Sequence, residues 1–209
     1  MHESLDLFDQ EEALFLPRLE DGQLSYYANA LPPVVADRVL SQCIHELPWR
    51  QDSMRIAGKR ILIPRLQNWF GDAGTQYSYS GIQFTPLPWT DFLLELKERV
   101  EELSQHSFNS VLANYYRNGC DSVDWHSDDE PELGEQPVIA SISLGVTRVF
   151  SLRHRYKKQL PQQKLSLPHG SLLIMSGSTQ RNWQHRLAKQ THIESERVNL
   201  TFRQIKGSR

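Results

Sequence analysis

The pair His126-x-Asp128 places an imidazole two residues before a carboxylate. In an extended strand alternate side chains share a face, so His126 and Asp128 would project together. Two histidines and one carboxylate form the iron site of non-haem oxygenases, which leaves coordination positions open for a co-substrate and oxygen. The pair therefore offers two of three iron ligands. A solvated acidic loop is the alternative interpretation, because the acids Asp129, Glu130 and Glu132 follow.

A third ligand must come from a distant histidine, and His185 in Trp-Gln-His-Arg is the candidate. It lies beside strand-like sequence, at a separation from His126 that is typical of such triads. His154, His169 and His192 compete with it in the same half of the chain. His169, between proline and glycine, has the pattern of a turn, and His192 that of a loop. We therefore predict a metal site at His126, Asp128 and His185.

The segment Arg197–Arg203 alternates between polar and apolar residues, as a strand with two different faces does. Its polar face carries Arg197, Asn199, Thr201 and Arg203. A guanidinium group matches a carboxylate with two parallel hydrogen bonds, so this face can hold a dicarboxylate such as 2-oxoglutarate, whose keto-acid end chelates iron. Asn114 and Tyr116 share a face of an earlier strand and can add hydrogen bonds. An ordinary amphipathic strand with its polar face in water is the alternative.

Hydrophobic periodicity predicts the elements that must position these side chains. Apolar residues recur at helical spacing in 33–46 and 89–105, and β-rich segments follow at 111–117, 138–144, 148–154, 171–175 and 197–205. Helices followed by a run of short strands favour packed sheets over alternating βαβ units. We predict a mainly β, α+β fold with a double-stranded β-helix (jelly-roll) core supported by N-terminal helices.

Length and composition predict one intracellular domain. A chain of 209 residues suits a single core. No apolar run approaches the ~20 residues that span a bilayer, and the acidic start lacks the plan of a secretory signal. Cys43 and Cys120 give neither a disulfide framework nor metal-ligand spacing. We expect a monomer in the cytoplasm, or in the nucleus of a eukaryote, with no membrane partner.

Charge is distributed unevenly along the chain, although the net charge is only −2. Acids are concentrated in residues 1–21 and 121–135, which leaves the remainder strongly basic. Two basic stretches lie at 50–65 and 153–158. Such segments can neutralise phosphates, so a nucleic-acid partner is compatible with the overall charge.

Six segments, in this order and spacing, resemble the AlkB family of nucleic-acid demethylases, most closely its DNA-repair branches. They are Asn114-Tyr-Tyr-Arg-Asn-Gly-Cys-Asp121, Trp125-His-Ser-Asp-Asp-Glu130, Ile139-Ala-Ser-Ile-Ser-Leu-Gly145, His169-Gly-Ser-Leu-Leu-Ile-Met175, Trp183-Gln-His185 and Arg197–Arg203. Upstream, Phe70-Gly-Asp-Ala-Gly74 and Tyr77-Ser-Tyr-Ser-Gly81 fit the same branch. The similarity covers roughly residues 48–205. It implies one dioxygenase domain at 26–209, with a helical, nucleotide-recognition part at 26–108 and the catalytic jelly roll at 109–205. The charge and scattered apolar positions of residues 1–25 predict a flexible acidic segment before it.

The resemblance also implies roles for individual residues. His126, Asp128 and His185 would bind Fe(II), while Asn114, Tyr116, Arg197 and Arg203 would hold 2-oxoglutarate, with Asn199 and Thr201 nearby. Asp129 would act on the exocyclic amine of the damaged base, beside Glu130. Tyr77 and Tyr79 would line the base pocket, for which a pair of core aromatics is the alternative. A finger made of Ile56, Ala57, Gly58 and Lys59 would probe the base stack.

The implied reaction is oxidative demethylation of bases such as 1-methyladenine and 3-methylcytosine, with O2 as oxidant and formaldehyde and succinate as products. The target nucleotide must be flipped out of a duplex or presented in a single strand. The duplex-preferring branch carries a bulky aromatic where this chain has Ala57, so we expect single-stranded DNA to be repaired at least as well as duplex. RNA is a further candidate substrate. A catalytically silent nucleic-acid-binding module and an oxygenase acting on a small molecule or a protein are the competing functions.

Overall fold

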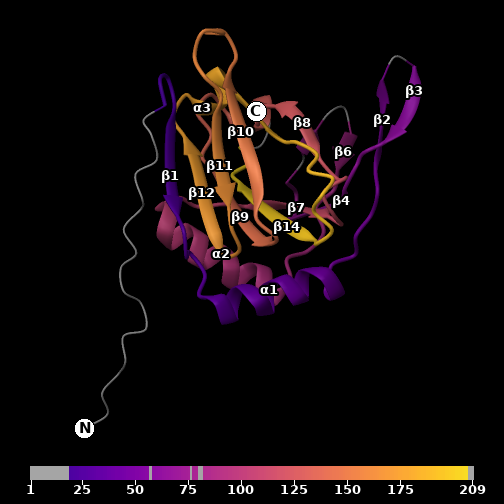
Figure 1. The fold of residues 1–209 in the computed structure, drawn as a ribbon. Helices are drawn as coiled ribbons and strands as arrows, with labels where there is room; N and C mark the ends of the chain where they lie inside the picture. Colours follow the sequence, from indigo (N-terminus) through magenta and orange to yellow (C-terminus); the bar gives the residue numbers. More distant parts are fainter. Residues whose placement is uncertain (1–18, 57, 76, 80–81, 207–209) are drawn as a thin grey trace.

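A computed structural model describes residues 19–206 apart from 57, 76, 80 and 81, and it does not describe the side chains of 56, 77–79 and 82–84. Two antiparallel sheets stack face to face within this part of the chain (Figure 1). The large sheet has the order β1 (Gln23–Tyr27), β12 (Ser171–Ser176), β9 (Ile139–Gly145), β14 (Arg197–Arg203), β7 (Ser110–Tyr116) and β4 (Leu66–Gly71). The small sheet has the order β11 (Gln163–Leu167), β10 (Arg148–His154), β13 (Trp183–Leu187) and β8 (Val123–His126).

The helices cover the outer face of the large sheet, as Figure 1 shows for α1 (Pro33–Glu46) and α2 (Asp91–Ser104). Their apolar sides pack on the alternate residues of the strands beneath, among them Ile142, Leu200 and Phe202. The Thr90 side chain accepts the Leu93 N–H and fixes the start of α2. The predicted helices and the predicted jelly roll are therefore confirmed.

A second apolar cluster fills the space between the two sheets. Leu112, Ile139 and Met175 from the large sheet meet Phe150 and Leu152 from the small one. The remaining described elements are short: the hairpins β2 (Ser53–Ile56) with β3 (Lys59–Leu62) and β5 (Tyr77–Tyr79) with β6 (Ile82–Phe84), a 3-10 turn at Pro131–Leu133, and α3 (Thr179–Asn182). No helix among the described residues is long and apolar enough to cross a bilayer.

The N-terminal part contributes both edges of the large sheet, β1 and β4. Of the segment 1–25 that the sequence predicts to be flexible, residues 1–18 lie outside the described residues. β1 begins at Gln23, and Lys157 binds Glu20 and Asp21 just before it. The acids near the start of the described chain therefore tie it to the loop between β10 and β11, a use that composition alone does not reveal.

Candidate metal centre and adjoining pocket

Three neighbouring strands line the inner face of the large sheet with polar side chains in cross-strand rows. Arg197 of β14 pairs with Tyr116 of β7. Asn199 lies between Asn114 and Ser143, and Thr201 between Leu112 and Ser141. Directly opposed residues in a sheet point to the same side, so these rows, polar apart from Leu112, face the small sheet together. The alternating apolar residues of β14 face the helices.

The polar face of β14 is inside the protein. Arg197 and Arg203 are each 2% exposed. A buried guanidinium group needs acceptors, because desolvation of a charge is costly unless it is paired. The alternative of an amphipathic strand with its polar face in water is therefore wrong.

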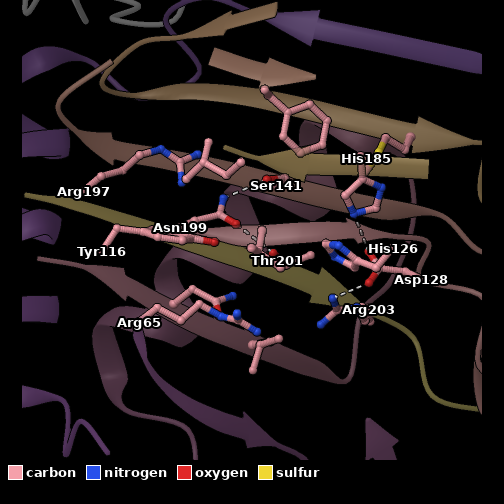
Figure 2. A pocket seen from close by; sticks show the side chains of 16 residues that line it. Arg65, Tyr116, His126, Asp128, Ser141, His185, Arg197, Asn199, Thr201 and Arg203 are labelled. Atoms are coloured by element: carbon pink, nitrogen blue, oxygen red, sulfur yellow. Dashed lines mark hydrogen bonds and ion pairs between the residues drawn. The ribbon is translucent and has the colours of Figure 1, made fainter. Parts of the chain in front are cut away.

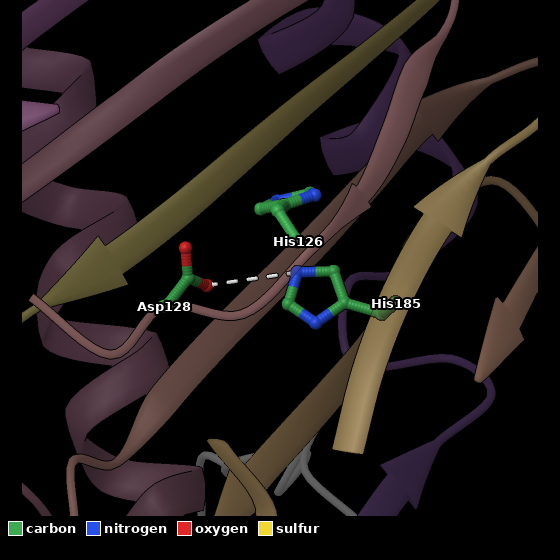
Figure 3. Close-up of side chains that lie close together, drawn as sticks. All are labelled: His126, Asp128 and His185. Atoms are coloured by element: carbon green, nitrogen blue, oxygen red, sulfur yellow. Dashed lines mark ion pairs between the residues drawn. The ribbon is translucent and has the colours of Figure 1, made fainter. Parts of the chain in front are cut away.

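His126, Asp128 and His185 come together on the small sheet (Figure 3). His126 ends β8 and pairs across the strands with His185 in β13, while Asp128 follows two residues after His126. One ligand atom from each residue lies within 4.8 Å of the others, and His185 Nε2 is 3.8 Å from Asp128 Oδ2. The three side chains can thus converge on one ion.

Hydrogen bonding and burial prepare both imidazoles as metal ligands. His126 Nδ1 lies 2.8 Å from the Asp124 carbonyl oxygen. A carbonyl only accepts, so Nδ1 carries the proton and Nε2 presents its lone pair. Burial lowers the pKa of His126, and it lowers the pKa of His185 to about 3. Both rings are therefore neutral near pH 7, as metal binding requires.

Asp128 is held as a carboxylate by a neighbouring cation. Burial raises its pKa, but the Arg203 guanidinium, 2.8 Å from Oδ1, together with the imidazoles of His185 and His126, lowers the pKa to about 2. The backbone N–H of Asp128 donates to Gln180 Oε1 at 2.9 Å and fixes the peptide. Two neutral imidazoles and one carboxylate are the ligand set of non-haem Fe(II), so the residues present fit that ion.

One pocket connects this cluster to the polar rows. Figure 2 shows Arg197 and Tyr116 at one end, and the triad with Arg203 at the other. Arg197 donates one hydrogen bond to Ser143 Oγ at 2.8 Å, while its Nε is buried and has no hydrogen-bond partner among the described residues. Burial lowers the Arg197 pKa to about 10, so the group stays charged at neutral pH. A carboxylate at this end would satisfy the unpaired donor.

The amide groups between these ends have different tasks. Asn114 Oδ1 accepts the Arg65 Nε–H at 2.7 Å, which turns its NH2 group away from Arg65 and leaves both hydrogens for a ligand. Asn199 donates both amide hydrogens, to Ser141 Oγ and to a backbone carbonyl, and accepts from Thr201. The Asn114 amide can therefore donate to a ligand, whereas Asn199 and Thr201 are bonded to each other and to β9.

Arg65 is a pocket residue that the sequence does not single out. It falls in the basic stretch 50–65, which predicts phosphate contacts, yet it is buried against Asn114 and lines the pocket. Ser141 and Ser143 were missed as well. A signal for them existed, because they alternate with Ile142 and Leu144 as the polar residues of β14 alternate with its apolar ones. Arg65 precedes β4 and offers no such periodicity.

The predicted base-pocket residues are not brought together in the described structure. Asp129 is exposed, and its carboxylate is 2.5 Å from Arg155 Nη1 rather than in the pocket of the triad. Glu130 does not line that pocket either. Gly58, with φ of +78°, makes the turn of the β2–β3 hairpin, and Lys59 is exposed beside it. Ala57 and the side chains of Ile56, Tyr77 and Tyr79 lie outside the described residues, so their roles stay predictions.

Comparisons with known proteins match most of the chain. A family model described as the 2OG-Fe(II) oxygenase superfamily matches residues 23–203. The human alpha-ketoglutarate-dependent dioxygenase alkB homolog 3 is 46% identical over 181 residues, which are 81% of this chain and 62% of that protein. The mouse DNA oxidative demethylase ALKBH2 is 38% identical over 179 residues, 81% of this chain and 75% of that protein.

Among solved structures, OsALKBH1 superposes with a TM-score of 0.63 over 92% of this chain and 100% of that chain. At 18% identity this match supports the fold alone. The chain spans about three fifths of the length of the alkB homolog 3 relatives that it matches.

Proposed function

We propose, from the premise that this chain belongs to the AlkB family within the 2OG-Fe(II) oxygenase superfamily, that it removes alkyl groups oxidatively from damaged DNA bases. The observation that carries the proposal is a single pocket with a two-histidine, one-carboxylate cluster at one end and a buried, incompletely bonded arginine at the other. This arrangement suits a metal and a dicarboxylate bound together.

His126, Asp128 and His185 would hold Fe(II), and Arg197 would hold the distal carboxylate of 2-oxoglutarate beside Tyr116. When bound, iron and 2-oxoglutarate supply O2 activation coupled to decarboxylation, which yields succinate and an oxidised alkyl group that leaves as formaldehyde when it was methyl. The protein's part is to orient the ligands and exclude water. Arg203 keeps Asp128 ionised in a buried place, and Asn114 directs its NH2 group toward the co-substrate.

The charges of the pocket affect how well it can accept a cationic damaged base. Cationic 1-methyladenine and 3-methylcytosine suggest an acid-rich base pocket, yet Asp128 lies 2.8 Å from Arg203 and Asp129 lies 2.5 Å from Arg155. Both acids are already compensated before a base enters. The proposal therefore depends on the metal and dicarboxylate ends of the pocket, with Asp129 and Glu130 as candidate contacts to the base.

Nucleic-acid binding is assigned to the β2–β3 hairpin, which projects from the body of the protein in Figure 1. Arg55, Lys59 and Arg60 are exposed on it, where phosphates can reach them. We propose that single-stranded DNA is repaired at least as well as duplex and that RNA is a secondary substrate. Because both cysteines are free thiols, we propose a cytoplasmic monomer, nuclear in a eukaryote.

The test is incubation of the protein with Fe(II), 2-oxoglutarate and oligonucleotides that carry 1-methyladenine or 3-methylcytosine, as single strands, duplexes and RNA, followed by mass spectrometry. We expect the mass of each lesion to fall by one CH2, as its methyl group leaves as formaldehyde, matched by one succinate. His185→Ala is the inactive control. Binding of the oligonucleotide without demethylation would indicate a silent module. Succinate production that no oligonucleotide stimulates would indicate an oxygenase with a small-molecule or protein substrate.

A further inference from the structure

A three-membered stack covers the outer face of the small sheet, on the side away from the pocket. The Arg153 guanidinium carbon lies 4.3 Å from the centre of the Trp125 ring, and that of Arg186 lies 4.4 Å from it. Arg153 is fixed in turn by two hydrogen bonds to Gln184 Oε1, at 3.0 and 2.8 Å. All three stacked residues are only partly exposed, so their cation–π contacts are partly desolvated and correspondingly stronger.

Two members of the stack, Trp125 and Arg186, lie on the strands that carry His126 and His185. Trp125 immediately precedes His126 in β8, and Arg186 immediately follows His185 in β13. Successive residues of a strand point to opposite faces, so the stack and the two imidazoles are opposite sides of the same short strands. Arg153 belongs to β10, the next strand, where it pairs with Gln184.

The backbone alone holds β8 weakly. β8 is the edge strand of the small sheet, so among the strands that the structure describes only β13 pairs with it. That pairing consists of two registered positions, His185 with His126 and Leu187 with Val123, and a bulge or irregularity separates them. A short edge strand with an interrupted ladder is prone to slip, and a slip of one residue would turn His126 away from His185.

We propose that the Arg153–Trp125–Arg186 stack is a positioning device that holds β8 on β13 in the register that brings His126 to His185. The inference rests on the metal site of the proposed function. The stack acts through the strand and touches neither metal nor substrate. Two guanidinium groups already lie within 4.4 Å of the centre of the Trp125 ring, where a stacking base would have to compete with them.

Metal affinity measured without 2-oxoglutarate or nucleic acid tests the proposal directly. Mn(II) titration followed by electron paramagnetic resonance reports binding to the resting protein. Trp125→Ala should weaken Mn(II) binding roughly 5- to 30-fold, the range expected for loss of two cation–π contacts. Trp125→Phe keeps an aromatic face and should remain close to the wild-type protein.

For the two arginines, the proposal and simple electrostatics predict opposite changes in metal affinity. Removal of a positive charge near a cation site strengthens metal binding if only Coulomb forces matter. Arg153→Gln and Arg186→Gln should instead weaken metal binding, because each removes one of the two cation–π contacts to Trp125. Lys164→Gln is the matched control: Lys164 is an exposed cation on β11 of the same sheet, outside the stack, and its loss should leave Mn(II) affinity unchanged or slightly stronger.

Every titration is made at a temperature where circular dichroism shows the variant to be folded, and hydrogen exchange of the β8 amides is measured in the same samples. Faster exchange in β8 together with weaker Mn(II) binding supports the positioning role. Unchanged Mn(II) affinity in Trp125→Ala, or tighter binding in both arginine variants, overturns it. Absence of Mn(II) binding by the wild-type protein contradicts the proposed function itself, so the two failures are distinguishable.

Discussion

Arg197 and His126 face each other from opposite ends of one pocket, but the strands that carry them are held differently. β14, which carries Arg197, has a partner on each side and seven registered pairs with β7 alone. β8, which carries His126, has one partner and two registered pairs. The dicarboxylate end is thus fixed by continuous backbone ladders, whereas the metal end depends on side chains. The site combines a rigid half with a half whose geometry is adjustable by mutation.

The largest expected effect is loss of any metal ligand. His126→Ala, Asp128→Ala and His185→Ala should each reduce demethylation to background while the protein remains folded, since each removes one of only three protein ligands. Turnover and metal titration check this prediction. Ser166→Ala, at an exposed position of β11, is the control for the effects of mutation and purification. Near-normal activity and metal affinity in any ligand variant would remove that residue from the triad.

The next effect concerns Arg148, which holds the segment before β8 to the segment after β13. Its buried side chain donates to the carbonyls of Asn118 and Asp121 before β8 and to that of Ala188 after β13. Arg148→Met would leave these acceptors unpaired, so we expect a loss of about 3–5 kcal/mol in the free energy of unfolding. Urea denaturation measures it. A change below about 1 kcal/mol would mean that water replaces the guanidinium group at little cost.

Substitutions of Arg197 and Arg203 should have different effects on co-substrate requirement and metal affinity, and so distinguish the two ends of the pocket. Arg197→Lys loses a charge-assisted fork of about 1.5–3 kcal/mol, so the required 2-oxoglutarate concentration should rise roughly 10- to 150-fold with unchanged metal affinity. The sequence predicts the same effect for Arg203→Ala. Because Arg203 contacts Asp128, we expect that variant to bind metal more weakly as well.

Metal titration and co-substrate kinetics on both variants separate the two ends of the pocket. Equal effects of the two substitutions on metal affinity would contradict the assignment of Arg197 to the distal carboxylate. An unchanged co-substrate requirement in Arg197→Lys would leave the buried Nε without a ligand to explain it.

The smallest effect lies in the loop that leads to β8. Burial raises the pKa of Asp121, but hydrogen bonds from Arg117, at 2.8 and 2.9 Å to its side chain, leave it below the ordinary value. A lowered carboxyl pKa stabilises the fold above the unfolded-state pKa, near 3.9, and this contribution disappears as pH falls through the folded value. Asp121→Asn should therefore cost about 1 kcal/mol at pH 7, since Arg117 is partly exposed. The difference from the wild type should vanish in acid, and a constant difference from pH 7 to pH 3 would contradict the charge as its source.

The rigid half of the site was also the half that sequence could predict. Arg197, Asn199 and Arg203 share a face because period-2 alternation holds throughout a strand paired on both sides. The triad required a histidine distant in sequence, and spacing favoured His185 over the other histidines without proving the choice. The ion pair of Asp129 and the pocket position of Arg65 escaped prediction for one physical reason: each residue lies beyond a strand end, where alternation no longer dictates direction. Their neighbours in space, Arg155 and Asn114, are remote in sequence.

The hydrogen bond between Arg197 and Ser143 fixes the position of one end of the pocket. Ser143 holds the guanidinium group in place on a sheet that cannot stretch, and the Asn199–Thr201 pair prevents the wall from folding inward. We therefore expect the distance between Arg197 and the metal cluster to stay nearly constant, and to favour a dicarboxylate of one chain length. A keto-diacid one carbon shorter than 2-oxoglutarate would reach either Arg197 or the iron, but not both at once.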